Sequence, residues 1–407
     1  MSEVLKPTTA AQLRDVIAWA AAEEASLDVR GHGTRRALGR PMQTSRTLDL
    51  SALAGIVSYE PEELVLTARA GTPMVEIDAV LRGRNQMLAF EPMDTGPLYG
   101  MAPDGGTLGG VVACNLSGPR RVKMGAARDH VLGFNGVSGR GESFKAGGKV
   151  VKNVTGYDLG KLLTGSFGTL AVMDEITLKV LPAPAKTRTV IVYGLDDVTA
   201  TAAMAEALNS PFEVSGAAHL PATVAQRSGV DYVRRRGEAV TALRIEGTGT
   251  SVTARCDGLK ALLSARGALE ELHTTNSIRL WHEVRDVASL LPDPGKVLWR
   301  LSVPPSDGPK VVAAVAAALG AEFFYDWGGG LVWLATAPTE DGGAGLIRDV
   351  VAATGGHATL FRASDSLRAA VPVFQPQQGT LADITRRIKD AFDPKRILNP
   401  GRMYAGV

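Results

Sequence analysis

The hydrophobic pattern of the first 180 residues alternates between helical spacing and short apolar runs. A helix that ends near Glu24 is predicted, because Gln12 follows Thr9 as in a capping box and apolar residues then recur every three or four positions, at Leu13, Val16, Ile17 and Ala20. Thr72 and Pro73 are expected to cap and begin a second helix. Short apolar runs predict strands at 27–30, 56–59, 64–70, 87–90, 131–137 and 170–180.

The last of these strands carries the clearest period of two. Leu170, Val172, Ile176, Leu178 and Val180 are expected to share one face, which Asp174 interrupts. Pro182-Ala-Pro184 then indicates a linker. We therefore predict a first domain over residues 1–184, a second over 185–370 and a C-terminal segment over 371–407.

The pattern of the second domain repeats the element order β-α-β-β-α. Two ferredoxin-like halves merged into one antiparallel sheet would give this order, and so would coincidence within an ordinary α+β domain. A further helix is predicted at 381–392 in the C-terminal segment. The predicted strands lie at 187–193, 213–220, 241–247, 297–303, 322–327, 331–335 and 357–362, and the predicted helices at 198–208, 252–266, 279–291, 309–319 and 345–353.

Composition and charge restrict the class of protein. A formal net charge of +2 over 407 residues gives no reason to expect nucleic acid or an anionic membrane surface as a partner. Cys114 and Cys256 lack metal-site spacing, which favours a reducing compartment. No secretory signal is expected. The apolar run at 311–321 is shorter than the roughly 20 residues that a helix needs to span a bilayer. The chain is expected to be a soluble cytoplasmic protein.

Glycine is concentrated between residues 95 and 170. The chain holds 46 glycines, more than the usual share of roughly 7%, and glycine lets a backbone approach a ligand closely. A backbone laid against a cofactor is therefore predicted, with an ordinary loop-helix-loop connector as the alternative. The longest of the glycine-rich runs, over residues 147–172, has glycine at 147, 148, 156, 160, 165 and 168.

Two more glycine-rich segments supply candidate polar contacts. Residues 30–35 directly follow a predicted strand, so their backbone N–H groups could bind a pyrophosphate, although a structural turn explains them nearly as well. Residues 103–118 would form a loop and a short helix packed against the ligand. The chain has no G-x-G-x-x-G after a strand and no G-x-x-x-x-G-K-[ST], which disfavours a Rossmann site and a P-loop.

The order of these segments resembles the FAD-binding domain of the vanillyl-alcohol oxidase/p-cresol methylhydroxylase superfamily. Within it, the chain is similar nearly end to end to the family of FAD-binding subunits of bacterial glycolate oxidases. The similarity is carried by residues 68–73 (ARAGTP), 118–121 (GPRR), 151–159 (VKNVTGYDL), 356–359 (GHAT) and 401–405 (GRMYA).

The resemblance implies an α+β fold, with a p-cresol methylhydroxylase-type FAD domain, an antiparallel cap and a C-terminal segment that returns to the FAD domain. It implies non-covalent FAD, because His32 does not match the position of the histidine that links FAD in some relatives. Asn399 would touch the flavin ring or brace its loop. The implied FAD-binding residues are Arg30, Gly31, His32, Gly33, Thr34, Arg35, Gly71, Gly106, Thr107, Gly109, Gly110, Asn115, Ser117, Gly118, Arg128, Asp129, Asn153, Gly168, Thr169 and Asn399.

The implied reaction is oxidation of glycolate to glyoxylate, which needs a cation for the carboxylate and a base for the hydroxyl proton. Arg300 and Arg362 are candidates for the cation and His357 for the base. No two histidines show the spacing of a metal cluster, so no metal is expected.

Implied partners are a small 2-hydroxy acid, a second FAD-binding subunit and an iron–sulfur subunit that passes electrons to a membrane quinone. Contact with the membrane would be peripheral and through the complex. The alternatives are a self-sufficient FAD oxidase of a 2-hydroxy acid or alcohol, and a non-catalytic assembly subunit that retains the fold.

Overall fold

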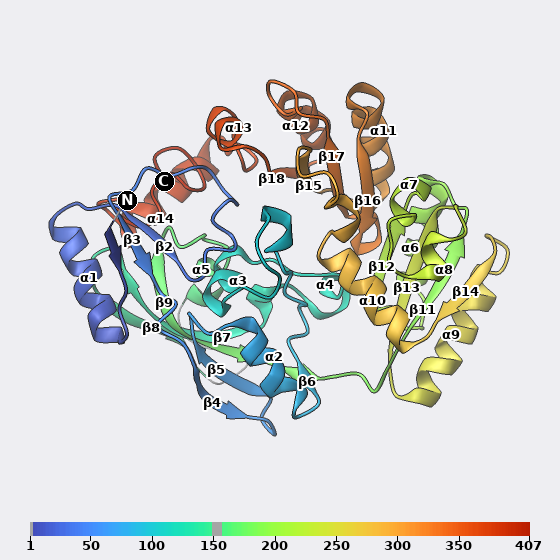
Figure 1. Ribbon diagram of the computed structural model, residues 1–407, viewed down its shortest axis with the longest axis horizontal. Coiled ribbons are helices and arrows are strands. Elements are labelled where there is room, and N and C mark those ends of the chain that lie inside the picture. Colours follow the sequence, from blue (N-terminus) through green and yellow to red (C-terminus); the bar gives the residue numbers. More distant parts are fainter. Residues whose placement is uncertain (1–2, 149–156) are drawn as a thin grey trace. The chain divides into compact units, whose positions relative to one another are not determined.

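The computed structural model describes residues 3–148 and 157–407, which divide into two compact units (Figure 1). The first unit comprises Met1–Ser117, Gly125–Ala183 and Pro376–Val407, and the second comprises Gly118–Met124 and Pro184–Gln375. The C-terminal segment therefore belongs to the first unit, and the short segment 118–124 belongs to the second. No helix among the described residues has the length and apolar character that crossing a membrane requires.

The first unit is built on two main sheets, beside a short antiparallel pair of β6(Gln86–Met87) with β10(Leu181–Pro182). The smaller is parallel, in the order β1(Glu3–Leu5)-β3(Arg46–Asp49)-β2(Leu27–Arg30). The larger is antiparallel, in the order β4(Ile56–Glu60)-β5(Val65–Arg69)-β9(Ala171–Lys179)-β7(Val131–Ser138)-β8(Ser143–Gly147). The helices of this unit are α1(Ala10–Ala22), α2(Met74–Arg82), α3(Leu108–Cys114), α5(Leu159–Leu163) and α14(Thr380–Phe392).

The long strand β9 does not keep one apolar face, contrary to the prediction. Ile176 packs in the cluster that includes Leu178, whereas Val172 packs in the separate cluster that contains the buried face of α1. The pairing with β7 shifts between Asn135 and Gly136, which leaves Asp174 outside the ladder as a bulge. The extra residue reverses the alternation of side chains, so one strand serves two cores.

Local capping differs in part from the sequence pattern. Thr9 caps α1 and accepts a hydrogen bond from the Gln12 N–H at 3.2 Å, as predicted. Thr72 does not cap α2; Pro73 stands at that position, and the Thr72 hydroxyl donates to the Arg69 carbonyl at 2.7 Å. The strand expected at 87–90 is only β6, Gln86–Met87, because the chain then turns.

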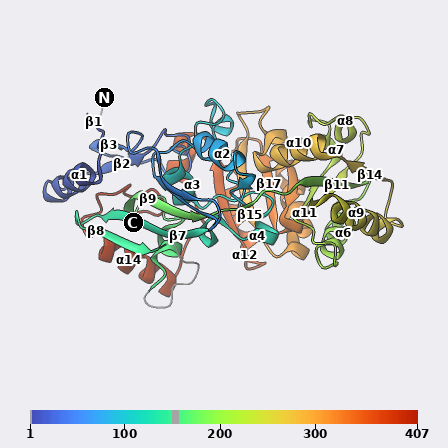
Figure 2. The ribbon, with the colours of Figure 1, turned by 90° about the horizontal axis from the view of Figure 1, so that it is seen from below.

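The C-terminal helix α14 packs against the larger sheet. The rings of Phe392 and Phe144 lie 6.1 Å apart, and Ile388 joins the same apolar cluster. Figure 2 shows α14 beside β7 and β8. The predicted helix at 381–392 is therefore confirmed, one residue longer at its start.

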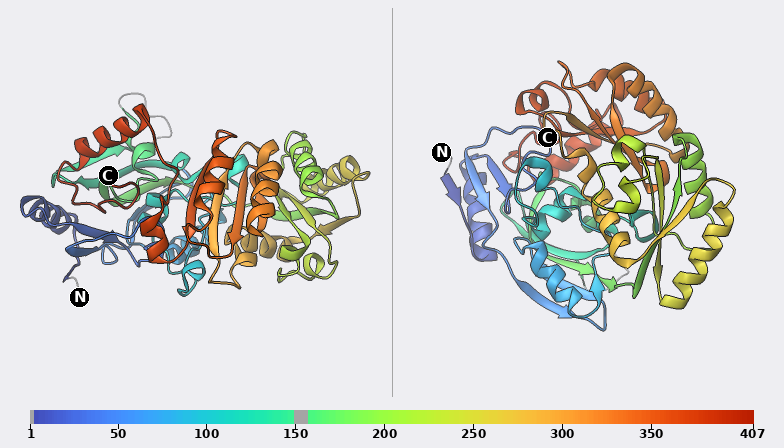
Figure 3. Two further views of the ribbon diagram at one scale, coloured as in Figure 1. Left: turned by 90° about the horizontal axis from the view of Figure 1, so that it is seen from above. Right: turned by 45° about the vertical axis from the view of Figure 1, so that its right-hand side comes forward.

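The second unit is one eight-stranded antiparallel sheet, whose strands run from green to orange-red in Figure 3. Its order is β14-β11-β13-β12-β16-β17-β15-β18. Each half has the ferredoxin-like order 4-1-3-2 and the halves meet edge to edge at the His219–Tyr325 pair, so the two merged halves are confirmed. The strands are β11(Lys186–Tyr193), β12(Gly216–Leu220), β13(Val240–Gly247), β14(Leu269–Leu272), β15(Val297–Ser302), β16(Glu322–Asp326), β17(Leu331–Thr336) and β18(His357–Arg362).

Helices cover both faces of this sheet. One face carries the main core with α6(Asp197–Leu208), α9(Gly249–Leu263), α11(Gly308–Leu319) and α12(Ala344–Ala352). On the other face, α10(Thr274–Arg285) packs on β11, where the Trp281 indole donates to the Thr189 hydroxyl at 2.8 Å. The prediction of a helix at 279–291 was displaced, because α10 begins in the polar run before Arg279 and ends before Val287, whose φ is 56°. Strand β14, with sequence LEEL, was missed because its polar residues suit an exposed edge.

Candidate functional site

A pocket in the first unit lies where the glycine-rich segments converge. The empty space between its walls, open solvent included, is about 730 Å³. Its walls come from the end of β2, the loop after it, α3, the loop at 167–168, β9 and the C-terminal segment. The lining residues are Asp28, Val29, Arg30, Gly31, Gly33, Thr34, Arg35, Arg36, Leu50, Ala70, Thr107, Gly109, Gly110, Ala113, Cys114, Phe167, Gly168, Ala171, Val172, Met173, Asn399 and Arg402.

Two glycines let the pocket walls approach one another. Gly33 has φ 81°, and a Cβ built on it would meet no atom within 4 Å, so its backbone faces open space. A Cβ on Gly109 would lie 2.9 Å from the Ala70 Cβ, while the Gly109 N–H donates to the Ala70 carbonyl at 2.7 Å. The first glycine leaves room for a ligand, and the second fixes α3 against the end of β5.

Two buried polar atoms at the pocket have no hydrogen-bond partner among the described residues. Asp28 is 1% exposed, and its Oδ1 atom is unpaired although Oδ2 lies 3.1 Å from the Arg36 Nε. Arg35 is also buried, its Nε is unpaired, and its Nη2 donates to the Met93 carbonyl at 2.9 Å. Burial lowers the pKa of Arg35. A buried acceptor and a buried cationic donor suit a ligand with hydroxyl and anionic groups, as FAD has.

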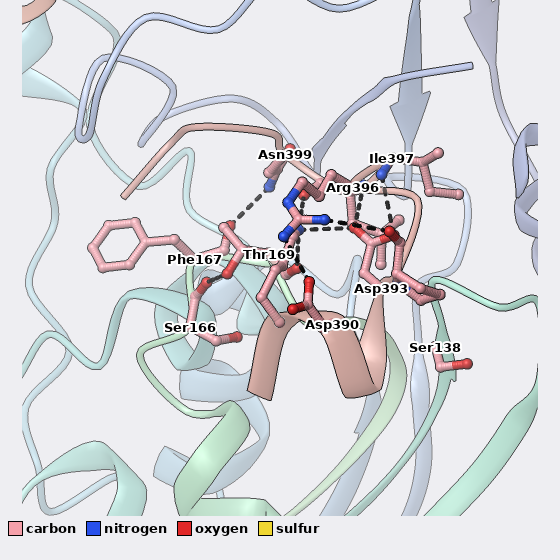
Figure 4. Close-up of polar contacts among 12 residues, drawn as sticks. Ser138, Ser166, Phe167, Thr169, Asp390, Asp393, Arg396, Ile397 and Asn399 are labelled. Atoms are coloured by element: carbon pink, nitrogen blue, oxygen red, sulfur yellow. Dashed lines mark hydrogen bonds and ion pairs between the residues drawn. The ribbon is translucent and has the colours of Figure 1, made fainter. Parts of the chain in front are cut away.

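The C-terminal segment holds the loop that closes one side of this pocket (Figure 4). Asn399 accepts a hydrogen bond from the Val29 N–H at 2.7 Å and donates to the Phe167 carbonyl at 2.8 Å. Lys389 donates to the Thr169 carbonyl at 2.6 Å and pairs with Asp393 at 2.8 Å, both side chains being fully buried. Asn399 therefore braces the loop and also lines the pocket.

Half of the predicted FAD-binding residues line this pocket: Arg30, Gly31, Gly33, Thr34, Arg35, Thr107, Gly109, Gly110, Gly168 and Asn399. Gly71, Gly106, Arg128 and Thr169 belong to the same unit without lining it, and Gly118 belongs to the second unit. Asn153 lies outside the described residues.

The remaining predicted residues support neighbouring loops. His32 is exposed and its Nδ1 lies 3.1 Å from the Gly105 carbonyl oxygen. Asn115 and Ser117 accept hydrogen bonds from the Arg128 N–H at 3.1 Å and the Ala127 N–H at 2.9 Å, and Asp129 accepts one from the Ala126 N–H at 2.8 Å.

Sequence reasoning missed Asp28 and Arg402 as pocket residues. A carboxylate inside a short apolar strand is a signal that could have identified Asp28. Arg402 lies 367 residues after Arg35 and donates to its carbonyl at 2.8 Å. No local pattern in the sequence indicates a contact over that separation.

In the second unit, the structure brings together two of the three predicted catalytic side chains. Arg300 on β15 and His357 on β18 project from the face opposite the main core, because Trp299, Leu301 and Ala358 occupy the core face. Desolvation, followed by the positive charges of Arg300 and Arg121, lowers the pKa of His357, although the side chain keeps an exposed surface. The imidazole is therefore held toward its neutral form.

Arg362 does not join this pair. It lies five residues after His357 on the same strand, beyond a register shift in the β15–β18 ladder that pairs it with Leu298. Its Nη2 donates to the Asp293 carbonyl at 2.8 Å, which ties down the loop before β15. Arg362 thus makes a structural contact, and its role beside a substrate stays a prediction.

Comparisons with known proteins define the class. Residues 1–147 match the family described as "FAD binding domain", and residues 375–403 match "FAD linked oxidases, C-terminal domain". The fold is similar to that of p-cresol methylhydroxylase, with a TM-score of 0.74, 14% identity and coverage of 98% of this chain and 88% of that one. The chain is thus an FAD-binding oxidoreductase with the p-cresol methylhydroxylase-type fold, as predicted.

The particular family follows from a second comparison. The chain is 35% identical over 389 residues to the glycolate oxidase subunit GlcE of Escherichia coli (strain K12), which covers 95% of each chain. It belongs to the family of this glycolate oxidase subunit. A D-lactate dehydrogenase of Anaerostipes hadrus is also 35% identical, but over 156 residues that cover 38% of this chain and 31% of that protein.

Proposed function

We propose that this chain is the FAD-binding subunit of a complex that oxidises glycolate to glyoxylate. The observation that supports this most directly is the glycine-walled pocket with an unpaired buried carboxylate oxygen at Asp28 and an unpaired buried guanidinium nitrogen at Arg35. A second FAD-binding subunit and an iron–sulfur subunit are the proposed partners. Electrons would leave through them to a quinone at the cytoplasmic face of the inner membrane.

The chain's own residues have separable tasks in this proposal. Arg35 and the backbone around Gly33 would hold the anionic part of FAD, and Asp28 would accept a hydrogen bond from one of its hydroxyl groups. When bound, FAD supplies the acceptor for the two electrons that leave with the hydrogen of the hydroxyl-bearing carbon. His357 would take the hydroxyl proton at a ring nitrogen, and Arg300 would hold the carboxylate.

The visible spectrum of the purified chain tests the proposal. We expect the purified chain to contain bound FAD, which denaturation of the protein should release. Its flavin absorption band should bleach when glycolate is added in the absence of oxygen. Bleaching by the isolated chain followed by steady turnover with oxygen would favour a self-sufficient oxidase. Failure of added FAD to raise the melting temperature would contradict the proposal and favour a non-catalytic subunit.

The pH dependence of bleaching is expected to report His357. Only the neutral imidazole accepts a proton, and the pKa of His357 is lowered from its ordinary 6.5. The bleaching rate should therefore stay high down through pH 6.5 and fall only at lower pH. Arg121→Gln removes one of the charges that lower this pKa, so the fall should move to higher pH.

His357→Gln should slow bleaching by about a hundredfold and remove the acidic fall. The matched control is His273→Gln, which changes a histidine of the same unit whose side chain is 73% exposed. Equal bleaching rates in the two variants at every pH would show that His357 is not the base.

A further inference from the structure

The indole of Trp327 is held by a strained backbone in the second unit. Trp327 has φ 53° and is followed by Gly328 at 67° and Gly329 at 102°. A left-handed conformation of a bulky residue costs roughly 1–2 kcal/mol and persists only where its surroundings fix it. Here the backbone N–H of Trp327 donates to Asp326 Oδ1 at 2.7 Å, and the indole N–H donates to the Gly118 carbonyl at 3.1 Å.

Two guanidinium groups lie against this ring. The Cζ atom of Arg121 is 4.3 Å from the ring centroid, and that of Arg300 is 5.0 Å from it. Arg300 also lies 5.9 Å from the centroid of Trp333, which pairs with it in the register of β15 and β17. These are cation–π distances, so the faces of the guanidinium groups are satisfied by aromatic rings.

The N–H edge of Arg300 remains unused. Within residues 3–148 and 157–407, Arg300 forms no hydrogen bond or ion pair with the protein, although it is half-buried. Burial, followed by the charge of Arg121, lowers its pKa to about 10, against the opposing effect of Asp326. None of its nitrogens is among the buried unpaired atoms of the described residues, so solvent reaches these donors and a ligand carboxylate could replace that water.

The position of Arg121 is fixed from the neighbouring residue. Arg120 forms a two-pronged pair with Glu246, at 2.6 and 2.9 Å. Burial alone would raise the pKa of Glu246, but Arg244 and Arg120 lower it to about 2, so this carboxylate stays charged. This pair fixes the segment that carries Arg121 to β13. Arg121 is therefore held where its positive charge repels that of Arg300.

We propose that Arg300 and Arg121, oriented by Trp327, form a binding site for a small carboxylate. The guanidinium fork of Arg300 would bind both carboxylate oxygens, and Arg121 would add a second positive charge. His357 would then face the rest of the same ligand. Identification of the ligand as the 2-hydroxy acid rests on the proposed function; the carboxylate site itself rests on the unpaired fork.

The test compares glycolate with ethylene glycol, which keeps the hydroxyl groups but lacks the carboxylate. Binding to the FAD-loaded protein is followed by tryptophan fluorescence, with Trp327→Phe to assign the signal, and reaction by flavin bleaching in a stopped-flow instrument. Arg300→Gln should raise the half-saturating glycolate concentration by about tenfold to a hundredfold in both readouts. Ethylene glycol should show little dependence on this residue.

Two further variants make the result interpretable. Arg300→Lys keeps the charge without the planar fork, so its half-saturating glycolate concentration should lie between those of wild type and Arg300→Gln. This variant can also be tested if Arg300→Gln does not fold. Arg236→Gln is the matched control, because Arg236 lies 4.4 Å from the Tyr193 centroid with a side chain that is 46% exposed. It should leave glycolate binding unchanged.

The outcomes separate this inference from the proposed function. If glycolate bleaches Arg300→Gln and Arg236→Gln with the same half-saturating concentration, the carboxylate site is overturned. The proposed oxidation of glycolate would not be affected by that result. An Arg300-dependent fluorescence change without bleaching would support the site and contradict direct oxidation by this chain. Equal binding of ethylene glycol and glycolate would also overturn the site.

Discussion

Replacement of Lys389 by methionine is expected to lower the melting temperature by about 6 °C or more. The change leaves the fully buried carboxylate of Asp393 without its cation, which costs about 3–5 kcal/mol. Each kcal/mol corresponds to roughly 2–4 °C for a folding unit of about 150–250 residues, the size range of the first unit. It also removes the donor from the Thr169 and Leu398 carbonyls, at 2.6 and 3.1 Å. Differential scanning calorimetry of the FAD-free protein measures the effect.

The same substitution should weaken FAD binding, because Lys389 and Asn399 together hold the loop at the pocket edge. Within that loop Phe167 has φ 55° and Gly168 has φ 69°, so the conformation needs outside support. Arg396→Gln is the control, since Arg396 pairs with Asp390 at 2.6 Å near the same helix end but its side chain is 40% exposed. That variant should change the melting temperature by less than about 2 °C. Similar losses in both variants would contradict the role of the buried pair.

This pair illustrates where sequence patterns stop. The helix that carries Lys389 was predicted within one residue, because its apolar positions repeat at helical spacing. A lysine and an aspartate four residues apart usually form an exposed pair. Only the tertiary arrangement shows that both are buried beneath a loop more than 200 residues earlier in the chain.

The order of the helices and strands could be predicted from the sequence, but the positions where an element is interrupted or ends early could not. The two ferredoxin-like halves followed from runs that obey a period of two or of 3.6. The bulge at Asp174 interrupts the alternation of side chains along a strand, and the left-handed residue Val287 ends a helix. The sequence prediction continued the strand and the helix through these residues without interruption. Strand β14 was missed because an edge strand needs no apolar run.

The site was predictable in kind and less so in detail. Glycine-rich strand ends marked the pocket, because glycine is needed where backbones approach a ligand. The face of Arg362 could not have been predicted from its odd separation from His357, because the register of the β15–β18 ladder shifts between them. The approach of Arg121 to Arg300 could not be predicted either, because it depends on how segment 118–124 joins the second unit.

The second large effect is expected from Gly33→Ala, which should weaken FAD binding at least tenfold. The added methyl group would stand in open space at the wall of the pocket, where the structure has no other atom within 4 Å. Alanine at φ 81° also costs roughly 1–2 kcal/mol of stability, independent of any ligand. Recovery of flavin fluorescence during titration with FAD gives the affinity, and a tenfold loss corresponds to about 1.4 kcal/mol.

Gly100→Ala separates these two effects. Gly100 has φ 70° and open space around its Cβ position as well, but it does not line the pocket. Both variants should therefore lose similar stability without FAD, and only Gly33→Ala should also lose the rise in melting temperature that FAD produces. If the two variants bind FAD equally, the loop after β2 does not contact the cofactor, and the assignment of this pocket to FAD would have to be abandoned.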